Sequence, residues 1–153
     1  MDLTQYQSTL LEMLATHEEL ISNLYKIYAG KIISHNDFWS KIAAEEIEHA
    51  QWIRNLQEKI KENLVLFKEG RFSKWVVQSS LDYTQKKIIE AQNNPITAVE
   101  ALNTALERER SMIESKVFEI FKSDAKELEI VLAALSAGTQ DHIERLQEAL
   151  NEV

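Results

Sequence analysis

The chain has 153 residues, a formal net charge of −8 from 25 acidic and 17 basic residues, and an ordinary hydrophobic share of 44%. This length predicts one domain, spanning 1–153, with a core of its own. Because it contains no cysteine, disulfides, thiolate catalysis, cysteine-ligated zinc and iron–sulfur clusters are excluded. The acidic balance and the lack of a concentrated basic patch argue against nucleic acid as a partner.

The chain begins MDLTQYQSTL, which lacks the basic and apolar regions of a signal peptide. No uninterrupted apolar run approaches the ~20 residues that a membrane span needs. We therefore expect a soluble, cytoplasmic protein without a membrane partner.

Only three glycines and one proline punctuate the chain, which indicates a few long helices, because sheets need more turn residues. Capping signals and apolar residues at 3.6-residue spacing divide the chain into four long helices and a shorter one. The expected ranges are Thr4 to about Ile33, Asn36 (as N-cap) to about Phe67, about Ser73 to Ala91, Thr97 to about Lys122, and Asp124 to nearly Val153. Short turns within the first and last pairs predict two antiparallel hairpins, with the shorter helix in the crossover between them.

Several polar residues fall on the apolar faces of the predicted helices, where an isolated charge is costly to bury. In the first helix Glu18 faces inward, whereas Glu19 falls on the polar face. In the second helix both Glu46 and His49 face inward, and their three-residue spacing makes them neighbours on one face.

The second pair of long helices repeats this arrangement in part. Helical spacing selects Glu109 rather than Glu107 for the inward face, and it brings Thr139 and His142 inward on the last helix. From Glu18 to His49 is 31 residues, and from Glu109 to His142 is 33. The chain therefore contains an internal repeat in which Thr139 takes the place of Glu46.

Together these residues predict a metal site. Carboxylate and imidazole ligands suit iron, manganese or zinc, and two ions bridged by carboxylates would neutralise the buried negative charge. A bundle with one Glu from each of two helices and Glu-x-x-His from the other two is the di-iron or di-manganese pattern. The candidate metal ligands are Glu18, Glu46, His49, Glu109 and His142.

Residues 43–50, AAEEIEHA, resemble the second-helix Glu-x-x-His-Ala segment of the rubrerythrin-like branch of the ferritin-like superfamily. Glu18 followed by Tyr25 is similar to that family's first-helix glutamate and tyrosine. The resemblance covers nearly the whole chain in helix order and spacing. It implies an all-α, ferritin-like four-helix bundle with a di-iron site, an oxidoreductase that reduces peroxide or oxygen or handles iron, and an external electron donor.

The chain departs from the family pattern in two places. Thr139 stands where the family has a glutamate, and Lys116 stands where an aromatic residue like Tyr25 would be expected on the third long helix. Three alternatives follow. The site holds two ions on five ligands, or one ion on Glu18, Glu46 and His49 with or without Glu109, or it is vestigial and holds no metal. The family's cysteine-rich electron-transfer module is excluded, because the chain has no cysteine.

A second hypothesis is a non-catalytic bundle that acts through self-association or a protein partner. The three tryptophans of the chain, Trp39, Trp52 and Trp75, are expected to pack in the core or in an interface. Exposed aromatic residues on a bundle of this size suggest a homodimer. We expect His17 on the helix surface or beside the site, His35 in solvent, and Glu45 and Glu48 in solvent or in salt bridges.

Overall fold

The computed structural model describes residues 3–61, 74–114 and 126–153. Every regular element in these ranges is helical, which confirms the all-α prediction. The helices are α1 (Leu3–Lys31), α2 (Asn36–Lys61), α3 (Lys74–Asn93), α4 (Ala98–Glu114) and α5 (Lys126–Glu152), with a 3-10 turn η1 (Ile33–His35) between α1 and α2. Within the described ranges, none of them combines the length and apolar character that a membrane span requires.

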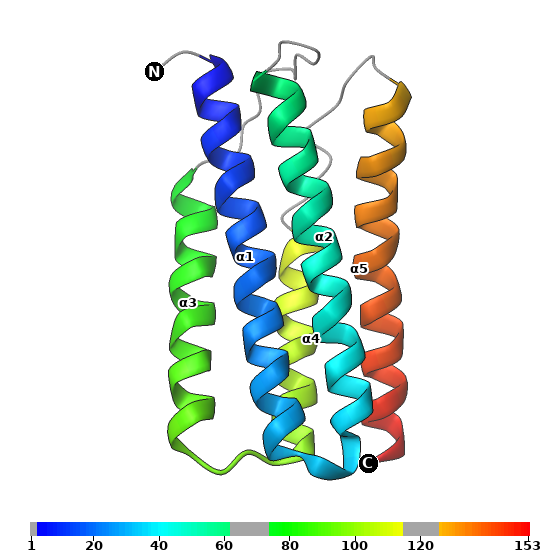
Figure 1. Ribbon diagram of the computed structural model, residues 1–153. Helices are drawn as coiled ribbons and strands as arrows, with labels where there is room; N and C mark the ends of the chain where they lie inside the picture. The colour runs from blue at the N-terminus through cyan, green and yellow to red at the C-terminus, as the bar shows by residue number, and fades with distance from the viewer. Residues whose placement is uncertain (1–2, 62–73, 115–125) are drawn as a thin grey trace.

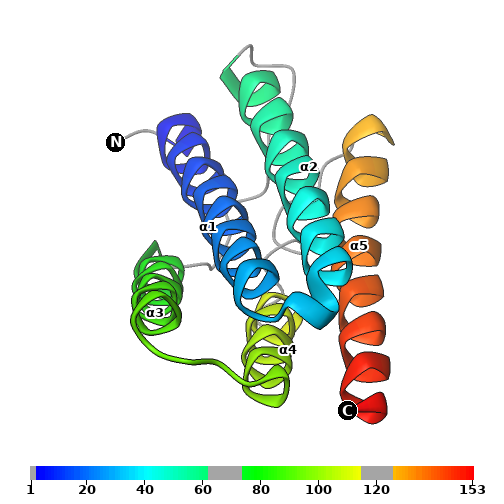
Figure 2. The ribbon, with the colours of Figure 1, turned by 60° about the horizontal axis from the view of Figure 1, so that its bottom comes forward.

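The axes of the helices are roughly aligned with one another (Figure 1). Helices α1 and α2 pack against each other in antiparallel orientation, and so do α4 and α5. Helix α3 lies along α1 and returns the chain to the end where α2 begins, so that α4 starts there. Figure 2 shows α3 outside α1 and α4, and α5 beside α2. Two helical hairpins therefore face each other, with α3 flanking one side.

The buried hydrophobic residues form two clusters at different levels of these helices. One cluster includes Leu14, Ile53 and Leu135, and the other includes Tyr25 and Trp39. Burying a large apolar side chain contributes about 1.5–3 kcal/mol, so these clusters hold the helices together. On α1, α2 and α5, buried polar residues lie between the positions that belong to the two clusters, and on α4 Glu109 follows Leu106, the last residue of that helix in a cluster. These polar residues form the candidate site.

The predicted boundaries hold to within a few residues where they can be compared. The capping box at the start of α4 is present: the Glu100 amide donates to Thr97 Oγ1 (3.1 Å), and the Thr97 amide donates to Glu100 Oε2 (3.4 Å). The role predicted for Asn36 is wrong. It has helical backbone angles, and its side-chain amide donates to Ala29 O (3.0 Å), so it ties the start of α2 to the end of α1.

Helix α1 already includes Leu3, one residue before its predicted start at Thr4. The other predicted boundaries at Phe67, Ser73, Lys122 and Asp124, and the departure from the family pattern at Lys116, lie outside the described residues.

Candidate metal centre

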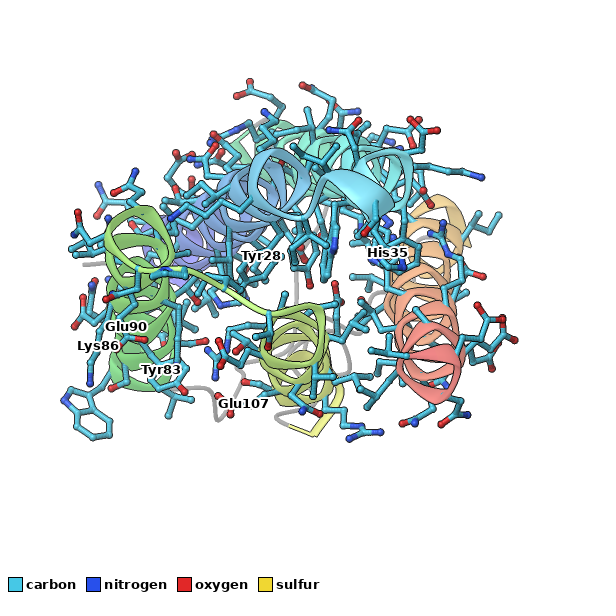
Figure 3. The ribbon with its side chains drawn as sticks, turned by 90° about the horizontal axis from the view of Figure 1, so that it is seen from below. Tyr28, His35, Tyr83, Lys86, Glu90 and Glu107 are labelled. Atoms are coloured by element: carbon cyan, nitrogen blue, oxygen red, sulfur yellow. The ribbon has the colours of Figure 1, made fainter. Side chains whose placement is uncertain are left out.

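All six polar residues that were predicted to face inward are buried, which confirms their placement. They lie between the two apolar clusters and are Glu18, Glu46, His49, Glu109, Thr139 and His142. Glu107 is exposed, and Figure 3 shows it on the side of α4 that is turned away from the middle of the bundle. Glu109 is therefore the inward carboxylate of α4, as predicted.

Glu46 is the central residue of this group. Its Oε1 lies 2.8 Å from Nδ1 of His142, and its Oε2 lies 3.4 Å from Nδ1 of His49. The two imidazole rings are 5.2 Å apart between centroids. One potential ligand atom from each of these three residues lies within 4.8 Å of the other two, which is close enough for a single metal ion to contact all three.

Glu18 and Glu109 extend the group onto α1 and α4. Oε1 of Glu109 lies 3.2 Å from Nδ1 of His142, and it accepts a hydrogen bond of 2.9 Å from the hydroxyl of Tyr25. The Glu18 carboxyl interacts with that of Glu46. Tyr25 therefore supports a carboxylate of the opposite hairpin.

The pKa values show how the group balances its charge without a cation. Burial raises the pKa of Glu18 well above its usual value, and the neighbouring Glu46 carboxyl raises it further. Burial, and then the charge of Glu109, raise the pKa of Glu46 as well. Burial opposes ionisation of Glu109 too, but hydrogen bonds from His142 and others hold its pKa below the usual value. Burial therefore favours the protonated forms of Glu18 and Glu46, which reduces the negative charge of the group.

The pKa values of the two histidines are shifted in opposite directions. Burial lowers the pKa of His49, which leaves its imidazole neutral and able to offer a lone pair. For His142 burial acts in the same direction, but the hydrogen bond with Glu109 raises its pKa overall. In the absence of a cation, His142 and Glu109 thus form a charge-assisted pair.

Thr139 does not contribute a ligand to this group. Although it is buried, its hydroxyl donates to the carbonyl of Leu135 one turn earlier in α5 (3.1 Å). Helix α5 therefore supplies one donor side chain, His142, where α2 supplies both Glu46 and His49.

Gly138 is a functional position that the sequence analysis missed. A Cβ atom at this residue would lie 2.5 Å from Nε2 of His49, so the imidazole packs directly against the backbone of α5. Glycine inside a helix costs roughly 1 kcal/mol relative to alanine, which makes its presence there a signal of close packing. That signal was available in the sequence.

A second missed feature is a chain of charged groups behind His142. Its Nε2 lies 3.6 Å from Oε1 of Glu45, and Glu45 accepts a hydrogen bond from Arg145. Arg145 Nε lies 3.0 Å from Asp141. Glu45 therefore forms a salt bridge, as expected, but it also faces the ring nitrogen of His142 that is turned away from Glu46. Carboxylates in such positions commonly orient metal-binding histidines.

His17 is buried, so its predicted place on the helix surface is wrong, while the alternative place beside the site is correct. Its Nε2 lies 2.8 Å from the hydroxyl of Ser80 on α3, which also accepts a hydrogen bond of 3.2 Å from Arg108. Burial, aided by the charge of Arg108, lowers the pKa of His17 to about 4. This polar contact fastens α3 beside the site.

The remaining residues singled out in the sequence lie as follows. His35 and Glu48 are exposed, as expected. Trp39 is buried in the core, Trp52 is half-buried against His49, and Trp75 is exposed on α3. The homodimer stays a prediction.

The donor set, with three carboxylates and two imidazoles in a buried layer, fits iron, manganese or zinc by its chemistry. Comparison with protein-family models, curated protein sequences and solved structures finds nothing that matches this chain.

Proposed function

We propose that this chain is a rubrerythrin-like metal-binding protein with a ferritin-like fold, whose core site holds two iron ions. Manganese and zinc are the alternative ions for the same donors. The observation that carries the proposal is the convergence of Glu46, His49 and His142, whose ligand atoms lie within 4.8 Å of one another in a buried layer.

The charge of the site supports a pair of ions over a single one. Glu18, Glu46 and Glu109 place three carboxyl groups in the interior, and the raised pKa values of Glu18 and Glu46 reflect the cost of ionising them there. Two divalent cations would neutralise all three carboxylates and allow both protons to leave.

The residues take the following roles in this proposal. Glu46 would be shared between the two ions, because its two oxygens face different histidines. His49 and His142 would each offer an imidazole nitrogen to an ion, and Glu18 and Glu109 would complete the set from α1 and α4. Tyr25 holds Glu109 in place through its hydrogen bond.

Bound iron would supply electron-transfer chemistry towards oxygen or peroxide. The protein's own contribution would be to hold the ions, to keep the site dry between the two apolar clusters, and to offer no ligand side chain at Thr139. An external protein or small molecule would supply the electrons.

Metal analysis after growth with iron and manganese tests the proposal. We expect about two ions per chain and the visible absorption of an oxidised iron pair. One ion per chain would restrict the site to Glu46, His49 and His142, whereas protein that binds no metal even on direct titration would overturn the proposal.

A second candidate function is a non-catalytic bundle with a vestigial site, acting through self-association or a protein partner. It is favoured by one observation: the polar groups already pair with one another, His142 with Glu109 and Glu18 with Glu46, while Thr139 bonds to its own helix. If this hypothesis is correct, the protein will contain no stoichiometric metal and will not show the visible absorption of an oxidised iron pair.

A further inference from the structure

A cleft of about 380 Å³ opens between α2 and α5, on the Trp52 side of the candidate metal centre. Its lining consists of Trp52, Asn55, Leu56, Glu58, Lys59 and Val131. Ligand-binding pockets in proteins typically measure about 300–1,000 Å³ and are mostly apolar with a few polar groups. The cleft therefore has the size and the character to hold one small molecule.

Trp52 lies between this cleft and the metal centre. The ring of Trp52 lies 5.2 Å from that of His49 between centroids, with an angle of 41° between the planes. Trp52 is half-buried and also lines the cleft, whereas His49 is buried. The indole thus forms the wall between the cleft and a predicted ligand.

On the His142 side of the site, an ion pair between Glu45 and Arg145 joins α2 to α5. At the level of His49, the imidazole itself packs against the backbone of α5 at Gly138, and the hydroxyl of Thr139 turns back to its own helix. Neither Gly138 nor Thr139 therefore contributes a carboxylate at this level.

We infer that the cleft between α2 and α5 binds a small uncharged molecule with an apolar body and places it, across Trp52, beside the metal centre. This inference rests on the proposed function. The apolar faces of Trp52, Leu56 and Val131 favour an apolar body. An anion is disfavoured, because the lining offers no excess of positive charge, with one acidic residue (Glu58) and one basic residue (Lys59), and the chain carries a net charge of −8.

Benzyl alcohol is a suitable probe, and benzoate is its charged counterpart of similar size. Calorimetric titration of the full chain, first without metal and then loaded with Co²⁺, should show one benzyl alcohol bound per chain and at least about tenfold weaker binding of benzoate. The visible spectrum of the Co²⁺-loaded protein should shift when benzyl alcohol binds.

Val131→Trp should fill the cleft and weaken the binding of benzyl alcohol by at least about tenfold, while Co²⁺ still binds. The matched control is Ile96→Trp, in a separate cavity of about 370 Å³ lined by Tyr28 and Thr104, and it should change neither. If circular dichroism shows Val131→Trp to be misfolded, Val131→Asp serves instead, since a carboxylate there should also exclude the apolar probe.

The possible failures can be told apart. Binding of benzyl alcohol that is absent, or unaffected by the folded Val131 variant, would overturn the inference. A Co²⁺ spectrum that does not respond to saturating probe would overturn the link between cleft and metal. Absence of Co²⁺ binding, with normal binding of benzyl alcohol, would instead remove the proposed function.

Discussion

The two halves of the candidate metal centre occupy equivalent positions in an internal repeat but are built differently. The α1–α2 hairpin supplies Glu18, Glu46 and His49, and the α4–α5 hairpin supplies only Glu109 and His142. At the position where the second half lacks its carboxylate, Thr139 forms a hydrogen bond within its own helix.

The comparison shows that each half depends on the other for the orientation of its ligands. Tyr25 of α1 donates to Glu109 of α4, and Glu45 of α2 faces His142 of α5. In the opposite direction, Gly138 of α5 makes room for His49 of α2. A ligand on one hairpin is therefore held by a residue on the other, so neither hairpin contains a complete site.

The largest effect should follow loss of the residue shared by both halves. Glu46→Ala removes the carboxylate that faces both His49 and His142, and we expect metal affinity to fall by more than about 100-fold, beyond the range for outer-sphere changes. Calorimetric metal titration measures this. Glu48→Ala, at an exposed position on the same helix, is the control and should bind metal normally.

A substitution on α5 should damage the ligand on α2. Gly138→Ala places a methyl group 2.5 Å from Nε2 of His49, so the imidazole must move, and metal affinity should fall by about 10–100-fold. The control is Gly30→Ala, where a Cβ meets nothing within 4 Å. That variant should bind metal normally and raise the free energy of unfolding by about 0.5–1 kcal/mol. Equal metal affinity in both variants would contradict the packing argument.

Thr139→Glu should make the halves alike. A carboxylate at this position, equivalent to Glu46 in the repeat, should tighten retention of the second ion by about tenfold. The metal-free protein should become less stable, because the change adds a fourth buried carboxyl group. Metal stoichiometry after dialysis, together with thermal melts with and without metal, tests both parts. A variant that melts lower in both states and loses metal would show that the second half has no room for the ligand.

The smallest effect should follow loss of support for one ligand. Glu45→Gln removes the charge that faces Nε2 of His142 and weakens the pairing with Arg145, while every predicted ligand stays in place. We expect metal affinity to fall by up to about tenfold, at the lower end of outer-sphere effects, with the stoichiometry unchanged. A matched Arg145→Gln variant should also lower the metal affinity slightly. A complete loss of metal binding in the Glu45 variant would contradict this supporting role and would indicate that Glu45 is itself a ligand.

The sequence by itself determined the helices and the inward set. The scarcity of glycine and proline, together with the spacing of apolar residues, was enough to predict the all-α class. The same spacing predicted that Glu109 and not Glu107 faces the core, because helical periodicity decides which side chains point inward. The local capping box at Thr97 was also readable, since its partners are three residues apart.

Only the tertiary structure decided how these residues meet. The contact between Gly138 and His49 joins positions far apart in the chain, as do those of Glu45 with His142 and of His17 with Ser80. No helical period relates such pairs, because their distances depend on how one hairpin packs against the other and where α3 lies. The sequence therefore named the predicted ligands, and the packing of the helices brought together the residues that orient them.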